Sequence, residues 1–144
     1  MHPLYAQANI LTADVIGAAI EVFRHFGPSL LESIYTRSLA LELILHGHRV
    51  QTEKRINIEY KGFFFEETLR FDLMVNECLL IESKVSELGI RPENRHQLLS
   101  YQKLMDIPLG LIFNFGDARF GDRGIQRVIL KGADNEVPAA RSPV

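Results

Sequence analysis

Three charged residues lie within two strand-like segments that are otherwise rich in leucine, isoleucine and valine. In the stretch RFDLMVNECLLIESK, residues 70–84, they are Asp72, Glu82 and Lys84. Removing a lone charge from water costs several kcal/mol unless a partner compensates for it. The pattern therefore indicates that something near these side chains neutralises them.

The length of the loop between the two strands decides whether the two carboxylates meet. A two-residue loop would place Asp72 opposite Ile81, whereas a three-residue loop over residues 76–78, or a bulge of one residue, places Asp72 opposite Glu82. The second register gathers apolar side chains on the other face, namely Phe71, Leu73, Val75, Leu79 and Ile81. We therefore expect Asp72 beside Glu82, with Lys84 on the same face.

Two neighbouring carboxylates repel each other, so the pKa of one should rise unless a cation lies between them. Hard oxygen ligands of this kind suit Mg²⁺ or Mn²⁺. The matching chemistry is phosphodiester hydrolysis, in which Lys84 orients or activates the attacking water and stabilises negative charge. The alternative is a half-exposed strand whose Asp72, Glu82 and Lys84 only pair with one another, and an isolated E-x-K triplet favours that alternative.

The elements that must position these residues follow from the spacing of apolar side chains. The expected helices are 8–26, 28–47 and 92–106, and the expected strands are 50–60, 63–75, 78–84, 108–115 and 125–130. The order predicts a mixed α+β (α/β) domain: two N-terminal helices, a three-stranded antiparallel meander, a helix and two further strands in one mixed sheet. We expect this single domain to span residues 1–131, followed by a loose C-terminal tail, 132–144.

The composition describes one ordinary globular domain. Of 144 residues, 47% are hydrophobic and 24% charged, and the formal net charge is −2. These values exclude a disordered or strongly basic protein, so net charge gives no support for nucleic-acid binding. A basic group near the end of the chain could still present a positive surface to phosphates. It consists of Arg119, Arg123, Arg127 and Lys131.

The N-terminal segment and the single cysteine bear on location. Asp14 and Glu21 interrupt the apolar run of the first helix, which follows no basic leader, so we expect neither a signal peptide nor a membrane span. Cys78 is the sole cysteine, so one chain can form neither a disulfide nor a thiolate metal cluster. A cytoplasmic location is the expectation that follows.

The ordered residues resemble the D…(D/E)-x-K core of the PD-(D/E)XK nuclease superfamily, whose fold is restriction endonuclease-like. The match comprises Asp72, the triplet 82–84 and a following helix that carries Gln97. More specifically, the blocks SLLESIY, FDLMVNECLLIESK, HQLLSYQKLMDIPLGLIFNFG and IQRVIL look like the GxxExxY group of this superfamily, over roughly residues 8–131.

The resemblance implies a role for each matching residue. Asp72, Glu82 and Glu32 are implied ligands of Mg²⁺ or Mn²⁺, Lys84 is the implied catalytic lysine, and Gln97 adds a polar group from the next helix. The implied activity is metal-dependent cleavage of DNA, with RNA as the second choice. The alternative function is a catalytically silent nuclease-fold module that acts with a partner. A homodimer is compatible with cleavage of both strands, since paired cuts need two sites.

Several of these positions have a simpler structural interpretation. The leading glycine of the GxxExxY pattern is Ser29 here, and Ser29 with Glu32 also forms a capping box; the two roles of Glu32 conflict only if the backbone uses its carboxylate fully. Tyr35 and Tyr101 match the tyrosines of the pattern, but aromatic residues at helical spacing are more often core. Gln97 could be a surface residue. We do not expect zinc, since the spacing of His46-Gly47-His48 has no third ligand to support it.

Overall fold

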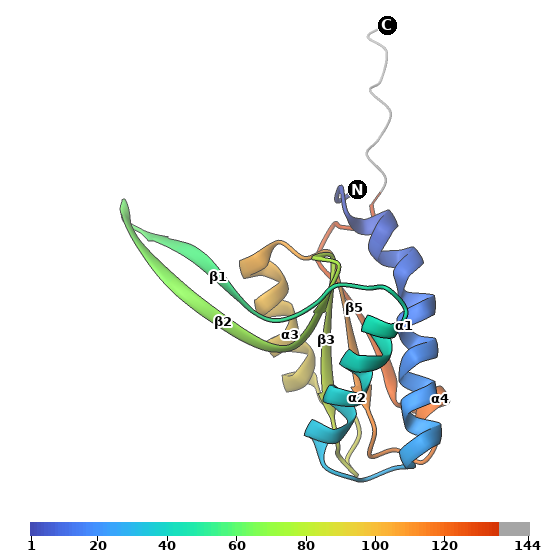
Figure 1. The fold of residues 1–144 in the computed structure, drawn as a ribbon. Helices are drawn as coiled ribbons and strands as arrows, with labels where there is room; N and C mark the ends of the chain where they lie inside the picture. Colours follow the sequence, from blue (N-terminus) through green and yellow to red (C-terminus); the bar gives the residue numbers. More distant parts are fainter. Residues whose placement is uncertain (136–144) are drawn as a thin grey trace, which may run out of the picture.

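A five-stranded sheet forms the centre of the protein, with helices on both faces (Figure 1). The computed structural model describes residues 1–135. In chain order the elements are α1 (Tyr5–Phe26), α2 (Glu32–Leu45), β1 (Val50–Tyr60), β2 (Phe63–Val75), β3 (Leu79–Lys84), α3 (Pro92–Met105), β4 (Leu109–Asn114), α4 (Phe120–Arg123) and β5 (Ile125–Ile129). The predicted order of elements is confirmed, and α4 is an additional short helix.

The strands follow the chain across the sheet in the order β1-β2-β3-β4-β5. β1, β2 and β3 form the expected antiparallel meander. β3 and β4 are parallel, because α3 carries the chain back to the starting edge, and β5 returns antiparallel to β4. One mixed sheet therefore contains all five strands, and the predicted mixed α+β fold is confirmed.

Local chemistry explains where several elements end. Lys61 and Gly62 both have positive φ values, 49° and 83°, which is the conformation of a tight hairpin turn between β1 and β2. Pro92 begins α3, where the missing N–H group of proline costs no helical hydrogen bond. Asp106 ends α3 in the left-handed conformation, and its N–H donates to the carbonyl of Gln102.

Two apolar clusters fill the two sides of the sheet. α1 and α2 cover one face, where their core residues pack with alternate residues of the strands; the strand members include Leu73, Val75, Leu79, Ile81, Leu109, Leu111 and Phe113. α3 covers the other face, over a smaller cluster of Leu69, Met74, Leu80, Leu98, Met105, Ile107, Ile112 and Val128. The sheet is therefore buried on both faces along its centre.

Phe71 is the exception to the predicted apolar face. The ladder between β1 and β2 shifts register between Gln51 and Glu53, so β2 bulges over residues 71–73. Such a bulge redirects the side chains that it contains. Leu73, Val75, Leu79 and Ile81 share one cluster as predicted, whereas Phe71 packs against the cluster beneath α3, so the prediction for Phe71 is wrong.

α1 is long and apolar enough, by length and composition, to cross a membrane. In the fold, however, one side of it lies in the core; its buried residues are Ala8, Leu11, Thr12, Val15, Ala18, Ala19 and Val22. Such packing is also what a core helix of a globular domain requires. The expectation that the chain lacks a membrane span stays a prediction.

Two regions near the C-terminal end have more structure than their composition suggests. The basic group is largely paired: Arg119 bonds to Asp122 and Arg123 to Asp117. Arg127 donates to Thr12 and Asn9 on α1. The expected positive surface is therefore partly neutralised.

In the predicted tail, Ala133 is buried and its carbonyl accepts the N–H of His2, while residues 136–144 lie outside the described residues.

The hairpin of β1 and β2 extends beyond the body of the fold (Figure 1). Aromatic residues at its far end are largely exposed, namely Tyr60, Phe63, Phe64 and Phe65. The Phe63–Phe65 run is therefore an exposed part of β2 and not a buried strand. The long hairpin adds an exposed arm to an otherwise two-sided core.

Candidate active site

The register between β2 and β3 brings the predicted site residues to one place. The paired residues are Leu73↔Ile81, Met74↔Leu80 and Val75↔Leu79. This is the register of a loop over residues 76–78, in which Asn76 and Glu77 both have positive φ. The predicted register, which keeps the charged side chains off the apolar face, is therefore confirmed.

Asp72 lies where the two strands separate. Beyond the Leu73–Ile81 pair, the N–H of Ser83 donates to Oδ2 of Asp72, at 2.8 Å, instead of continuing the strand ladder. The bulge in β2 supplies the extra length that lets the carboxylate of Asp72 reach the N–H of Ser83. The backbone of β3 therefore fixes the carboxylate of Asp72 beside the Glu82–Lys84 segment.

Glu82 and Lys84 form an ion pair in which Lys84 Nζ lies 3.1 Å from Glu82 Oε1. Both side chains are largely covered, with exposed fractions of 14% and 27%. Within the described residues, the other carboxylate oxygen of Glu82, Oε2, is buried and has no hydrogen-bond partner. A buried carboxylate oxygen without a partner is costly, and a bound cation would compensate for it.

Glu32 adds a third carboxylate from α2, of which it is the first residue, and its pKa responds to the charges of Lys84, Asp72 and Glu82. The capping-box interpretation is wrong: Ser29 has a φ of 67°, far from the extended backbone of a capping residue, and α2 begins after Leu31. The N–H of Ser29 instead donates to the carbonyl of Phe115 at the end of β4. The loop before α2 is therefore attached to the end of the sheet at which β3 and β4 finish.

Tyr35 holds the loop that precedes α2. Its side chain is fully buried, with the ring stacked on Phe115 at 4.4 Å between centroids. Its hydroxyl accepts the N–H of Leu30, at 3.0 Å, and donates to the carbonyl of Gly27. The tyrosine thus fixes the loop that positions Glu32, a role in which core packing and site geometry coincide.

Burial dominates the electrostatics of the three carboxylates. It raises the pKa of Asp72, against the Ser83 N–H and Lys84, and it raises the pKa of Glu82, against Lys84. Glu32 is an exposed residue overall, yet partial burial of its carboxyl group raises its pKa, and the charges of Asp72 and Glu82 add to that rise. Three acidic groups are therefore close enough to influence one another.

Lys84 is the cation of this cluster. Burial alone lowers its pKa, but the negative charges of Glu82, Glu32 and Asp72 outweigh burial, so the pKa of Lys84 is raised. Lys84 therefore carries a positive charge at neutral pH. One lysine faces three carboxylates, so the cluster favours a further cation, and its oxygen donors are those that Mg²⁺ and Mn²⁺ prefer.

The remaining predicted site residues, Gln97 and Tyr101, lie on α3. Gln97 is exposed on α3, and Tyr101 packs against the apolar cluster beneath α3, which is the core interpretation for Tyr101. The buried glutamine of α3 is Gln102, which donates to the carbonyl of Val128 and so ties α3 to β5. A site role for Gln97 stays a prediction.

The fold and this cluster define a class. A mixed sheet whose third strand carries an acid-x-lysine triplet, beside an aspartate from the preceding strand, has the arrangement of restriction endonuclease-like nucleases. A sequence profile of the PD-(D/E)XK nuclease superfamily matches residues 9–128. The chain therefore belongs to the PD-(D/E)XK nuclease superfamily.

One solved structure, titled "Crystal structure of SSO0001", is similar to this chain at 17% sequence identity and a TM-score of 0.46. The similarity covers 78% of this chain and 61% of that one, so this chain matches less than two thirds of the length of that protein. Among curated proteins, no sequence matches this chain.

Proposed function

We propose that this protein is a metal-dependent nuclease that hydrolyses phosphodiester bonds of DNA, with RNA as the second candidate substrate. Superfamily membership supports a nucleic-acid substrate in general. The observation that carries the proposal is the gathering of Asp72, Glu82 and Glu32 around Lys84, with one oxygen of Glu82 buried and unpartnered among the described residues. Such an unneutralised group is typical of functional sites.

In this proposal Asp72, Glu82 and Glu32 hold Mg²⁺ or Mn²⁺. The bound ion supplies Lewis-acid activation of the phosphate and of the attacking water. The N–H of Ser83 keeps the Asp72 carboxylate oriented. Lys84 stays protonated and stabilises the negative charge that develops on the phosphoryl oxygens.

We also propose that the chain belongs to the GxxExxY group. The position of the leading glycine, Ser29, has a φ of 67°, a conformation that favours glycine. The glutamate of the motif, Glu32, is close enough to the acidic cluster for its pKa to respond to Asp72 and Glu82. The tyrosine, Tyr35, bonds to the loop that precedes α2, at the N–H of Leu30 and the carbonyl of Gly27. Each motif position thus has a physical reason to be what the pattern requires.

The test combines metal binding with cleavage. Purified wild type, Asp72→Asn and the exposed-site control Glu93→Gln are titrated with Mn²⁺ by calorimetry and assayed on single-stranded DNA, duplex DNA and RNA with Mg²⁺ or Mn²⁺. We expect binding and cleavage in wild type and control and their loss in Asp72→Asn. Cleavage that survives Asp72→Asn would contradict the proposal. A folded wild type that neither binds Mn²⁺ nor cleaves any substrate would favour the silent module.

Location and assembly complete the proposal. A reducing cytoplasm fits the buried free thiol of Cys78, whose pKa burial raises, so that it stays protonated and unreactive. A homodimer would supply two sites for paired cuts, and the exposed aromatic end of the β1–β2 hairpin offers it a candidate contact. Light scattering of wild type and Phe64→Ser measures both the dimer and the contribution of the hairpin.

A further inference from the structure

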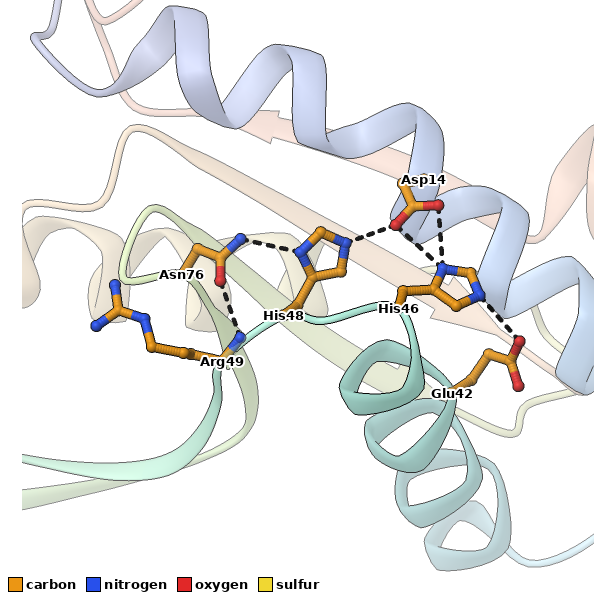
Figure 2. Close-up of polar contacts among 6 residues, drawn as sticks. All are labelled: Asp14, Glu42, His46, His48, Arg49 and Asn76. Atoms are coloured by element: carbon orange, nitrogen blue, oxygen red, sulfur yellow. Dashed lines mark hydrogen bonds and ion pairs between the residues drawn. The ribbon is translucent and has the colours of Figure 1, made fainter.

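A second polar cluster joins α1, the end of α2 and the segment before β1 (Figure 2). Asp14 lies on α1, His46 directly follows α2, and His48 precedes β1. One carboxylate oxygen and one ring nitrogen from each histidine all lie within 4.8 Å of one another. In the sequence, His46 and His48 have the spacing of metal ligands but no neighbouring third ligand. The packing of α1 against α2 supplies it.

We infer that Asp14, His46 and His48 form a binding site for a divalent late first-row transition metal, for which Zn²⁺ is the reference ion. Imidazole nitrogen with carboxylate oxygen is a donor set that suits Zn²⁺, whereas oxygen donors alone suit Mg²⁺ or Mn²⁺. The site shares no residue with the Asp72–Glu82–Lys84 cluster and does not depend on nuclease activity. The sequence-based expectation of no zinc rested on the missing third ligand.

The distances suit a small ion. His46 Nδ1 lies 3.1 Å from both oxygens of Asp14, and His48 Nε2 lies 2.5 Å from Oδ2 of Asp14. Tetrahedral zinc ligands at about 2.0–2.1 Å from the metal lie about 3.3 Å apart, so small side-chain shifts make room for the ion. Asp14 and His46 keep exposed fractions of 47% and 33%, which leaves access for water as a fourth ligand.

His46 is arranged as metal-bound histidines commonly are. Its far nitrogen, Nε2, lies 3.0 Å from Oε1 of Glu42, one helical turn earlier (Figure 2). A carboxylate at that nitrogen accepts an Nε2–H and retains it when a metal binds, so the proton that a cation displaces is the one that Nδ1 donates to Asp14. Glu42 therefore keeps Nε2 protonated and leaves Nδ1 as the nitrogen that binds the metal.

His48 has the opposite arrangement. The N–H of Arg49 donates to Oδ1 of Asn76, at 2.9 Å, which turns Nδ2 of Asn76 toward His48 Nδ1 at 3.1 Å. Because Nδ2 is a donor, Nδ1 of His48 must accept, and the ring proton lies on Nε2, where it donates to Asp14. A metal must displace that proton. Asn76 therefore weakens metal binding without closing the site.

This arrangement gives a variant that should improve the site. Asn76→Asp retains an acceptor for the Arg49 N–H and adds an acceptor for a proton on His48 Nδ1, which frees Nε2 for the metal. We expect the affinity for Zn²⁺ to rise at least tenfold. An unchanged or weaker affinity would overturn the assignment of Nε2 as the ligand atom.

The primary test is calorimetric titration of Zn²⁺ into the full chain, with folding checked by circular dichroism. We expect one ion per chain in wild type and in the matched control His96→Gln, whose histidine is exposed on α3, and at least a tenfold loss of affinity in His46→Gln and His48→Gln. Asp14→Asn keeps the size of the side chain and one acceptor, so it tests the site if a histidine variant is less stable. No binding at 100-fold molar excess, or equal binding in all variants, would overturn the inference.

Two further measurements separate this site from the nuclease cluster. Asp72→Asn should bind Zn²⁺ as wild type does, because the donor sets are separate; a matching loss would overturn the inference. Bound metal should also stabilise the fold: at a free Zn²⁺ concentration 100 times the Kd, the ratio of folded to unfolded protein rises about 100-fold. That rise should be absent in His46→Gln.

Discussion

The two polar clusters of this protein differ in how completely the protein itself neutralises them. In the cluster of Asp72, Glu82, Glu32 and Lys84, three carboxylates share one lysine, and within the described residues Oε2 of Glu82 is buried without a partner. In the histidine cluster, both oxygens of Asp14 and all four ring nitrogens have polar neighbours. The first cluster has fewer positive charges than carboxylates, whereas in the second protons already satisfy the carboxylate of Asp14.

The pKa shifts of the carboxylates follow this difference. Burial raises the pKa of Asp72, whereas hydrogen bonds from His48 and His46 lower the pKa of Asp14. An added cation relieves the first cluster directly, but it must replace a proton in the second. The first cluster therefore favours an added cation, whereas the second is already satisfied by its own hydrogen bonds.

Removal of the lysine charge should have the largest effect. Lys84→Met keeps the length of the side chain but leaves the developing phosphoryl charge without its cation, so we expect kcat/KM for cleavage to fall at least about 100-fold. The matched control is Lys103→Met, which removes an exposed lysine from α3. Cleavage rates under saturating Mg²⁺ measure the difference. Equal rates in the two variants would show that Lys84 is a structural partner of Glu82 only.

The loop that carries Glu32 provides the next test. Tyr35→Phe removes a buried hydroxyl that serves both Leu30 and Gly27. We expect a loss of about 1–3 kcal/mol in the free energy of unfolding, or about 5 °C in Tm, together with weaker cleavage as Glu32 moves. Tyr101→Phe is the matched control. Thermal denaturation and cleavage that are unchanged in Tyr35→Phe would remove the link between this hydroxyl and the site.

Asp72→Asn should stabilise the metal-free fold while it abolishes metal binding. Because burial raises the folded-state pKa of Asp72 above 3.8, its stabilising contribution is present below pH 3.8 and is lost as pH rises through the folded-state pKa. At pH 7 the ionised group is therefore a cost. Asparagine retains an acceptor for Ser83, and we expect Tm to rise by about 2 °C.

The comparison is Tm at pH 7 and at pH 4 in the presence of a chelator. The gain should shrink towards pH 4, because wild-type Asp72 takes up its proton as the pH falls through its raised pKa, and Asp134→Asn at an exposed position should show no gain. Destabilisation by Asp72→Asn at pH 7 would indicate that the protein already neutralises this carboxylate.

The histidine cluster should give the smallest effect, seen only in metal-free protein. Asp14 raises the pKa of His46 above 6.5, so the stabilisation by protonated His46 is complete below pH 6.5 and is lost as pH rises through the raised pKa. We expect His46→Gln to flatten the fall in stability between pH 6 and pH 8. Denaturant titration across that range, with His96→Gln as control, measures the slope. Parallel slopes would contradict the expected pairing.

The sequence is most informative where contacts are local. The alternation of apolar residues along β2 and β3 is sufficient to select the register, because the other register would bury charge, and Lys84 follows Glu82 by strand alternation. The placement of Asp72, Glu82 and Lys84 on one face therefore follows from residue order. The placement of Phe71 does not, since the bulge that redirects it depends on pairing with β1.

The spacing of residues along the chain does not predict contacts between distant segments. Ser29 reads as a capping residue, but the tie of its N–H to Phe115 sets a backbone conformation that local propensity does not specify. Asp14 is separated from His46 by 32 residues, so only the packing of α1 on α2 reveals it as a neighbour. The ion pairs of Arg119 and Arg123 likewise depend on the turns that bring Asp122 and Asp117 to them.

The positions of the site residues along the chain determine the order in which they come together during folding. Asp72, Glu82 and Lys84 all belong to one short hairpin, whose pairs are only a few residues apart in the chain. Local pairs close rapidly, whereas Glu32 arrives only when α2 docks on the sheet, which requires the closure of a much longer loop. We therefore expect this acidic cluster to assemble in two stages: Asp72 and Glu82 with Lys84 first, and Glu32 late, together with the rest of the core.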